Sequence, residues 1–215
     1  MSFLKMAKIL IADDHAILRA GLKEILVRDL KDVICGEAES AEQVLAQVRT
    51  QHWDLVILDV TMPGRSGFDI LADLKSLRPE LRVLILSMHP EDQYGKRALK
   101  AGAFGYLMKE SAPEELIQAI RKILAGGRYV SAALADRLAA DLSGDAQRQP
   151  HEMLSPREFE ILCMIGTGKT VSRIAEDLHL GITTVSTHRA RILEKLKMTT
   201  TADLMRYALR NNLAG

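Results

Sequence analysis

Short apolar runs alternate with longer amphipathic segments through residues 8–126. The runs are Lys8–Ala12, Asp32–Gly36, Leu55–Leu58, Arg82–Leu86 and Gly105–Leu107. Each is too short for a buried helix and is followed by polar or turn residues, which indicates a parallel strand covered on both faces. Helical patterns follow them, beginning near Ala16, Ser40, Gly67, Glu91 and Pro113. Five such units predict an α/β fold with a doubly wound parallel sheet, for which the strand order 2-1-3-4-5 is the natural choice.

Three acids stand where the first and third of these runs end. With that strand order, Asp13, Asp14 and Asp59 converge on the crevice where the winding direction switches. Three carboxylates repel one another unless a cation joins them. The set offers oxygen ligands with no His or Cys nearby, which favours a hard ion, and Mg²⁺ suits a site with few carboxylates and room for water and phosphate.

The fourth and fifth runs add Ser87 and Lys109 to the same edge. Taken singly, Ser87 is an ordinary strand-end cap, Lys109 a solvated surface charge and Asp59 a turn or capping residue. Together, these residues and the metal supply a carboxylate nucleophile, a cation, a hydroxyl and an ammonium ion. An acceptor of a phosphoryl group needs these parts, because the transfer depends on positioning and charge neutralisation.

A different pattern follows residue 127. The segment Ser131–Leu142 has helical periodicity, whereas Ser143–Glu152 has no apolar periodicity and is typical of a flexible tether. Helical patterns then resume with a cap sequence at Ser155. The remaining predicted helices are Val171–Leu178, Thr183–Leu196 and Thr201–Leu213. The first two of these are separated by a short turn containing Gly181, which is the helix-turn-helix arrangement.

The predicted helix Thr183–Leu196 has two distinct sides. Val185, His188, Ile192 and Leu196 share one side, so we expect His188 to pack rather than to bind a metal or a base. The other side and its flanks, expected to meet DNA bases and phosphates, comprise Thr183, Thr184, Ser186, Thr187, Arg189, Ala190, Arg191 and Lys195. The last predicted helix is the candidate dimer surface.

Composition narrows the class of protein. The net charge of +1 gives no global sign of nucleic-acid binding, but residues 154–215 hold nine Lys and Arg against six Asp and Glu. Cys35 and Cys163 form no paired motif, which indicates reduced thiols. No long apolar stretch occurs, and the N-terminus reaches acids too early for a secretory signal, so we expect a cytoplasmic protein with no membrane contact.

The motifs of residues 8–126 resemble the receiver domain of bacterial response regulators, which is a flavodoxin-like fold. They are Asp-Asp at 13–14, D-x-x-M-P-G at 59–64, Ser87 and G-Y-L-M-K at 105–109. The resemblance implies that Asp59 is the phosphoacceptor, and that Asp13, Asp14, Asp59 and the Thr61 carbonyl hold Mg²⁺. It also implies that Ser87 and Lys109 contact the phosphoryl group and that Tyr106 is the aromatic switch residue.

Residues 154–213 resemble the LuxR-type helix-turn-helix of the NarL/FixJ regulators, through LSPREFEIL at 154–162 and TVSTHRARILEKL at 184–196. The family commonly has Asn-Lys where this chain has Val171-Ser172, Ser at Gly181 and Lys at Ser186. These departures leave the fold intact. They shift the expected specificity toward DNA shape and phosphate contacts, since long basic side chains are missing from the reading face.

These resemblances imply a transcription regulator, not an enzyme, with a receiver at 1–127, a linker at 128–153 and an all-α DNA-binding domain at 154–215. The expected partners are a sensor histidine kinase, double-stranded promoter DNA and a second copy of the chain once phosphorylated. Phosphorylation is expected to draw Ser87 and Lys109 inward, vacating space into which Tyr106 turns.

Three other functions are weighed against this one. One is a phosphorylation-independent regulator that uses its receiver only to dimerise. Another is an aspartyl-phosphate phosphatase, which needs a second Asp where Thr61 stands. The third is suggested by Gly168-Lys169-Thr170, the ending of a P-loop, but Cys163 replaces that motif's first glycine and the preceding segment has a helical period.

Overall fold

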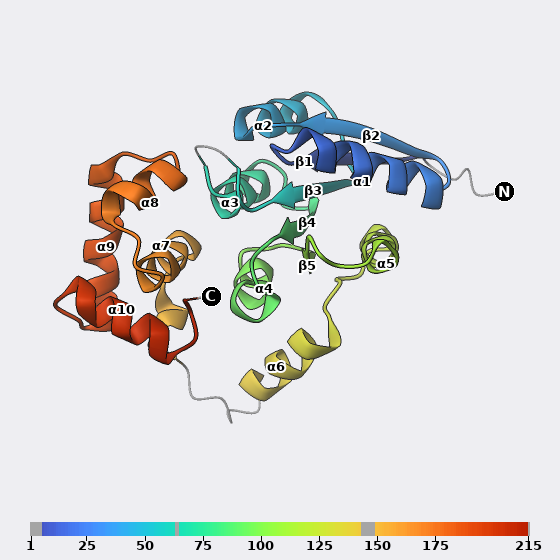
Figure 1. The fold of residues 1–215 in the computed structure, drawn as a ribbon. Coiled ribbons are helices and arrows are strands. Elements are labelled where there is room, and N and C mark those ends of the chain that lie inside the picture. Colours follow the sequence, from blue (N-terminus) through green and yellow to red (C-terminus); the bar gives the residue numbers. More distant parts are fainter. Residues whose placement is uncertain (1–5, 63–64, 143–148, 215) are drawn as a thin grey trace. The chain divides into compact units, whose positions relative to one another are not determined.

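The computed structural model describes residues 6–62, 65–142 and 149–214, and it divides the chain into two compact units, Met1–Ala139 and Ala140–Gly215 (Figure 1). The sequence predicts that the receiver ends at residue 127 and that the DNA-binding domain begins at residue 154. These two boundaries stay a prediction.

The first unit is built on a five-stranded parallel sheet. Its strands are β1 Ala7–Ala12, β2 Val33–Ala38, β3 Leu55–Asp59, β4 Arg82–Ser87 and β5 Gly105–Met108. They lie in the order β2-β1-β3-β4-β5, and every neighbouring pair is parallel. The doubly wound topology predicted from the alternating pattern is therefore confirmed, and β3 lies in the centre.

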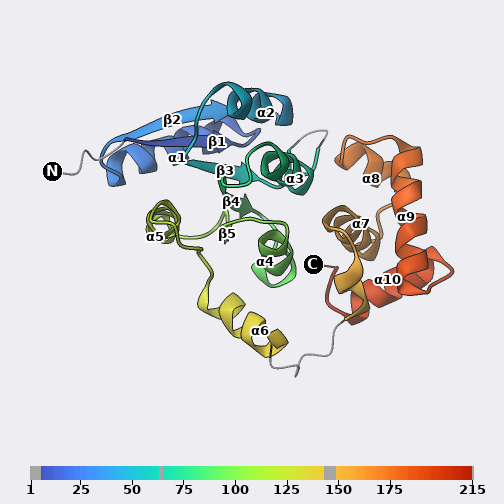
Figure 2. The same cartoon turned by 180° about the vertical axis from the view of Figure 1, so that it is seen from behind.

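Helices follow each strand and cover both faces of the sheet. They are α1 Ala16–Asp29, α2 Ala41–Thr50, α3 Gly67–Leu77, α4 Glu91–Lys100 and α5 Pro113–Leu124. Helices α1 and α5 lie on one face and α2, α3 and α4 on the other, as the views from the two sides show (Figures 1 and 2). Side chains alternate along a strand, so Ile9 and Ile11 of β1 pack with Leu22 and Leu26 of α1 in the core beneath that face.

A further helix, α6 (Ala132–Leu142), follows α5 and packs on α4. Leu134 is buried, and one of its methyl carbons lies 2.8 Å from where a Cβ would stand on Gly95. Ser131 caps the helix through the Leu134 N–H and donates a hydrogen bond to Glu91. The predicted helix in this segment is confirmed, and its first turn is attached to α4.

The second unit is all-helical. It contains a 3₁₀ turn η1 Pro150–Met153 and the helices α7 Pro156–Gly166, α8 Val171–Asp177, α9 Ile182–Leu196 and α10 Thr201–Arg210. Ser155 caps α7 through a reciprocal bond with Glu158, as the sequence predicts. Helix α7 packs against α9 and α10, and their buried apolar side chains supply the core of the unit.

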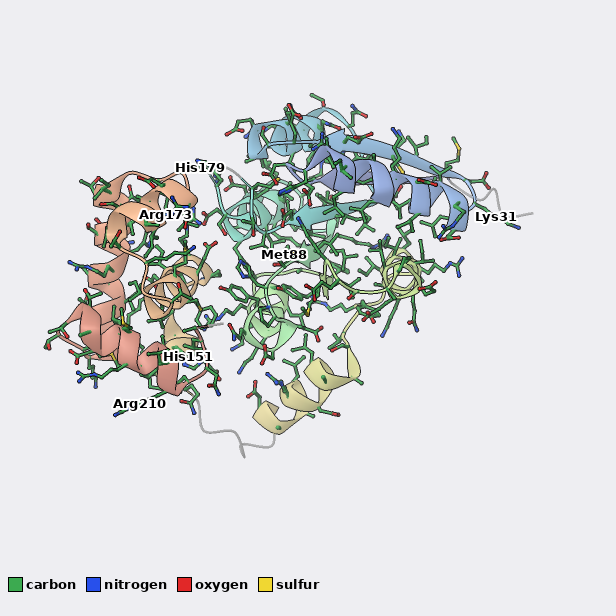
Figure 3. All side chains as sticks on the ribbon, viewed as in Figure 1. Lys31, Met88, His151, Arg173, His179 and Arg210 are labelled. Carbon is green, nitrogen blue, oxygen red and sulfur yellow. The ribbon has the colours of Figure 1, made fainter. Side chains whose placement is uncertain are left out.

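One detail of this unit adds to the sequence-based expectation and one differs from it. The predicted turn between α8 and α9 contains Gly181, which is an extended N-cap, and its left-handed residue is His179, with φ 52°. Residues 150–152, expected within a flexible tether, form part of η1, where His151 Nδ1 lies 2.9 Å from the Tyr207 hydroxyl (Figure 3). Residues 143–148 of the predicted tether lie outside the described residues.

None of the described helices is both long enough and apolar enough to span a membrane.

Candidate functional site

The carboxyl edge of the sheet brings together side chains that are far apart in sequence. Asp59 ends β3, Asp13 follows β1, Ser87 ends β4 and Lys109 follows β5. Asp59 is only 1% exposed, and Asp13 and Ser87 are equally shielded from solvent. The convergence expected from strand order is therefore present in the structure.

Lys109 joins the two buried acids. Its Nζ lies 2.6 Å from Asp13 Oδ2 and 2.8 Å from Asp59 Oδ2. Burial raises the pKa of Asp59 above its ordinary value, and the hydrogen bonds from Lys109 and Thr61 offset only part of that rise. Burial lowers the pKa of Lys109, but its hydrogen bonds to Asp13 and Asp59 outweigh this effect and leave the pKa raised. Lys109 is therefore a cation shared between two carboxylates.

The loop after β3 holds Asp59 in place. The Thr61 N–H donates to Asp59 Oδ1 at 3.0 Å. Ser66, which is buried, caps α3, and the Gly67 N–H bonds the Val60 carbonyl. A Cβ on Gly67 would stand 2.5 Å from the Asp59 carbonyl oxygen, so only glycine allows α3 to begin this close to the acid. Sequence reasoning missed the supporting role of Ser66 and Gly67, although a Ser-Gly pair opening a helix was a visible signal.

The charges of the site fit a divalent cation. Asp13, Asp14 and Asp59 each offer an oxygen within a cluster whose ligand atoms all lie within 4.8 Å of one another. Asp14 Oδ1 is shielded from solvent and accepts no hydrogen bond within the described residues. One ammonium against three carboxylates leaves two negative charges, which Mg²⁺ would balance.

One expectation about this cluster was wrong. The sequence predicts an oxygen-only site with no His nearby, yet His15 belongs to the cluster. Its Nδ1 lies 2.9 Å from Asp14 Oδ1 and 3.1 Å from Asp13 Oδ1. The error arises because His15 directly precedes a helical pattern, whereas in the fold it is the N-cap of α1 and sits at the edge of the sheet.

Ser87 and Tyr106, which the sequence predicts to act in a switch, both contact the backbone of His89. Ser87 Oγ accepts a hydrogen bond from the His89 N–H, and the Tyr106 hydroxyl donates to the His89 carbonyl at 2.8 Å. Tyr106 is fully buried, and burial raises the pKa of its hydroxyl. The ring of Tyr106 therefore lies inside the fold in this structure. The expected movement of Ser87, Lys109 and Tyr106 on phosphorylation stays a prediction.

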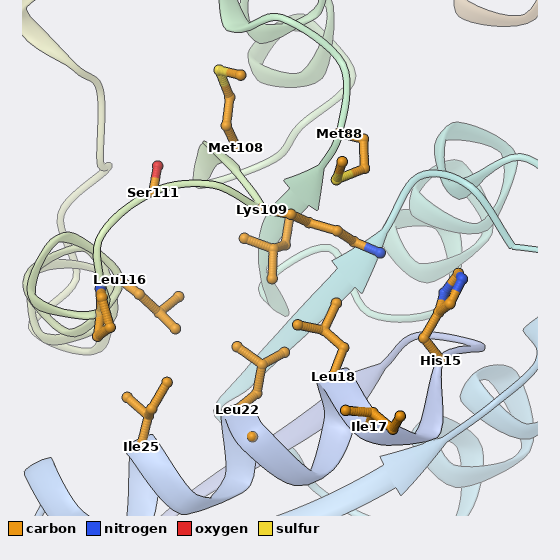
Figure 4. Close-up of a pocket in the computed structure, with 13 residues that line it drawn as sticks. His15, Ile17, Leu18, Leu22, Ile25, Met88, Met108, Lys109, Ser111 and Leu116 are labelled. Carbon is orange, nitrogen blue, oxygen red and sulfur yellow. The ribbon is translucent and has the colours of Figure 1, made fainter.

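An apolar groove of about 620 Å³ opens beside the site. Its walls are α1 and the segment from β5 into α5, and the side chains of Lys109 and His15 stand at one end of it (Figure 4). Ile17 on its rim is 90% exposed, and Met88 is also exposed. The sequence pattern did not predict this apolar groove.

In the second unit, α9 presents the two sides that its periodicity predicts. Val185, Ile192 and Leu196 are buried, and His188 is half-buried. The residues expected to meet DNA that the structure leaves exposed are Thr183, Thr184, Thr187, Ala190 and Arg191; Ser186 is half-buried. Thr187 donates its hydroxyl hydrogen to the Thr183 carbonyl, which leaves its methyl group and oxygen lone pairs for a partner.

Two basic residues on the flanks of α9 bind side chains of their own unit. Lys195 Nζ lies 2.6 Å from Glu158 Oε2, and Arg189 donates to the Thr201 hydroxyl at 3.0 Å. Their sequence-based assignment as phosphate contacts therefore competes with a structural role. On α8, Arg173 pairs with Glu176 and Asp177 (Figure 3). Arg191, by contrast, is exposed and makes no salt bridge among the described residues.

Comparison with known proteins identifies both units. Residues 9–121 match the response regulator receiver domain, and residues 152–208 match the bacterial regulatory proteins of the luxR family. Response regulator GacA of Pseudomonas aeruginosa is 36% identical over 210 residues, covering 97% of this chain and 98% of the relative.

Solved structures give the same result. RcsB from Salmonella enterica serovar Typhimurium, bound to promoter rprA in the presence of the phosphomimetic BeF₃⁻, is 25% identical with a TM-score of 0.66, covering 94% of this chain and 98% of that one. A structure of two RcsB dimers bound to two parallel DNAs is 26% identical with a TM-score of 0.60, covering 94% of this chain and 98% of that one.

Proposed function

Because the chain belongs to the two-component response regulators of the NarL/FixJ family, with a receiver and a LuxR-type helix-turn-helix domain, we propose that a sensor histidine kinase phosphorylates Asp59 and so controls binding to promoter DNA. The observation that carries this proposal is the buried Asp59 held between Lys109 and the Thr61 N–H.

In the proposed transfer, an oxygen of Asp59 attacks the phosphorus of a phosphohistidine, a new P–O bond forms and the P–N bond to the kinase breaks. Lys109 stays paired with the resulting acyl phosphate, and Ser87 bonds a phosphoryl oxygen. A magnesium ion held by Asp13, Asp14, Asp59 and the Thr61 carbonyl would neutralise the charge of the incoming group. The buried location keeps water from the acyl phosphate.

Labelling with acetyl phosphate and Mg²⁺ tests this assignment. The wild type is expected to take up one phosphoryl group, and Asp59→Asn none, because an amide cannot form the acyl phosphate. Asp69→Asn, which changes an exposed acid in the first turn of α3, is the matched control and is expected to label normally. Stoichiometric labelling of Asp59→Asn would refute the assignment. Asp14→Ala is expected to weaken Mg²⁺ binding, since it removes a ligand.

On the DNA side, the proposal places two copies of α9 in successive major grooves, with half-site centres roughly 10 base pairs apart. The exposed residues Thr183, Thr184, Thr187 and Ala190 would meet bases, together with the half-buried Ser186, and Arg191 a phosphate. Support comes from the similar RcsB structures, which are DNA complexes and in one case contain dimers. Helix α10 stays the proposed dimer surface.

One observation favours a second candidate, a regulator that binds DNA without phosphorylation and uses its receiver to dimerise. Tyr106 is buried and its hydroxyl donates to the His89 carbonyl, so contacts within the chain itself hold the ring inside. Sedimentation and promoter binding, measured for the wild type with and without BeF₃⁻ and for Asp59→Asn, separate the two candidates. Equal affinity and equal self-association in all three samples would favour the second.

A further inference from the structure

The start of α9 leaves a large apolar side chain in solvent. Ile182 is the first residue of this helix, which begins at the turn from α8 (Figure 1), and it is 56% exposed. Gly181, the N-cap, supplies no side-chain hydrogen bond, whereas Thr170 and Thr200 cap α8 and α10 with their hydroxyls. A single exposed isoleucine is ordinary on a protein surface, so its significance depends on the residues around it.

The exposed residues that follow Ile182 on α9 carry methyl groups and no charge. Within the described stretch 182–190, the exposed residues are Ile182, Thr183, Thr184, Thr187 and Ala190. The Thr187 hydroxyl donates to the Thr183 carbonyl at 2.9 Å, so its hydrogen is already used within the helix. Ile182, the half-buried Ser186 and Ala190 follow one another at four-residue spacing, which places them along one side of α9.

The side chains that usually read guanine and adenine are missing from the exposed part of this stretch. Guanine is most often read by Arg or Lys, and adenine by Asn or Gln. Arg189 is the only Arg or Lys among residues 182–190, and it is half-buried, with its guanidinium donating to the Thr201 hydroxyl at 3.0 Å. The same stretch holds no Asn or Gln. The group on a base edge that an apolar side chain can recognise in the major groove is the methyl group of thymine.

We propose that Ile182 contacts a thymine methyl group, and that α9 therefore selects its half-sites by thymine methyl groups and not by guanine contacts. This inference rests on the proposed function, which places α9 in the major groove. The N-terminal residues of a recognition helix are those that contact base edges, and Ile182 is the first residue of α9. From Ile182 to Ala190 the helix rises about 12 Å, which spans about four base pairs. Binding would cover an isoleucine that is exposed to water in the free protein.

Replacing thymine by uracil tests the contact, because uracil keeps the hydrogen bonds of the A·T pair and lacks only the methyl group. Sites are first selected from random DNA with the full-length wild type and BeF₃⁻, and each thymine is then replaced singly by uracil. At least one replacement in each half-site is expected to weaken wild-type binding about fourfold, the effect of losing one buried methyl-sized group. This measurement needs no variant, so it does not depend on how well a variant folds.

Two variants then assign the contact to its residue. Ile182→Ala is expected to bind the thymine and the uracil forms of that site equally. Met153→Ala truncates another exposed apolar side chain of the same unit and is the matched control, so it is expected to keep the fourfold difference.

Three results would overturn the inference while DNA binding stands. In the first, A·T pairs are selected but no uracil replacement weakens binding, which means that α9 reads the shape of the groove. In the second, Ile182→Ala retains the full difference between thymine and uracil, which means that another residue contacts the methyl group. In the third, the selected half-sites contain no thymine. If the wild type selects no sequence at all, the proposed promoter binding is itself wrong, and the inference fails with it.

Discussion

Removing the Lys195 side chain distinguishes a structural lysine from a DNA-binding one. Its ammonium lies 2.6 Å from Glu158 Oε2, and the same oxygen accepts the Ser155 N–H at the start of α7. The Glu158 side chain is 4% exposed and that of Lys195 is 38% exposed. In Lys195→Met, the carboxylate would keep its backbone partner but lose its counter-ion.

The exposure of the two side chains determines how much stability Lys195→Met loses. A hydrogen bond to a charged group contributes roughly 1.5–3 kcal/mol, and breaking a fully buried pair costs more. Since Lys195 is over a third exposed, water can replace part of its interaction, and we expect a loss of about 1.5 kcal/mol. Hydrogen exchange of α7 and α9 amides in the full-length protein should therefore become roughly tenfold faster.

The same pair predicts a dependence on pH. Burial raises the pKa of Glu158, but its hydrogen bonds with Lys195 and Ser155 outweigh burial and leave the pKa below its ordinary value. A carboxyl with a depressed pKa in the folded state adds stability above its unfolded pKa, about 4.3, and this stability is lost as the pH falls through the folded pKa. The protection of α7 and α9 should fall below pH 4 in the wild type and less steeply in Lys195→Met.

A double-mutant cycle with Glu158→Gln completes the test, because glutamine can still cap α7. If the two residues act as a pair, the double variant should lose less protection than the two single variants together. Unchanged protection in Lys195→Met, together with weaker DNA binding and a salt slope lowered by about one, would refute the reasoning and return Lys195 to the phosphate contacts.

Single contacts elsewhere in the chain give three more predictions. Gly67→Ala should lower the free energy of unfolding by at least about 2 kcal/mol, since the added Cβ would stand 2.5 Å from the Asp59 carbonyl oxygen; denaturant unfolding of the receiver checks this. Leu134→Ala should release α6 from α4, seen as faster amide exchange confined to α6. Arg191→Ala should weaken binding to all DNA sequences and lower the salt slope by about one unit, whereas Thr187→Ala should alter sequence preference, measured by selection from random DNA.

Sequence patterns predicted the elements because those elements are set by local periodicity. The buried strand Leu55–Asp59 and the two sides of α9 follow from which residues must avoid water. Strand order then placed Asp13 and Asp59 together, since the carboxyl ends of parallel strands share an edge. The acids of the site could therefore be predicted from the amino-acid sequence alone.

Other features depended on side-chain reach, which no periodicity encodes. Lys195 lies at a helical position where it could extend either to solvent or back to Glu158, 37 residues away, and only the folded chain shows the second. His15 directly precedes a helical pattern, yet its capping position turns its ring toward the acids. The sequence pattern did not predict that His179 is the left-handed residue of the turn before α9, since the hydrogen bonds that close α8 set that conformation.

The charges and contacts of the receiver also indicate how a phosphoryl group would act. A divalent ion and Lys109 would balance the three carboxylates, and phosphorylation of the buried Asp59 would add roughly one negative charge to the site. The nearest hydroxyl on the adjoining strand end is Ser87, which holds the His89 N–H, while Tyr106 holds the carbonyl of the same residue. If Ser87 turned toward the phosphoryl oxygens, His89 would lose one of these two anchors, so the segment entering α4 would move although Tyr106 stayed buried.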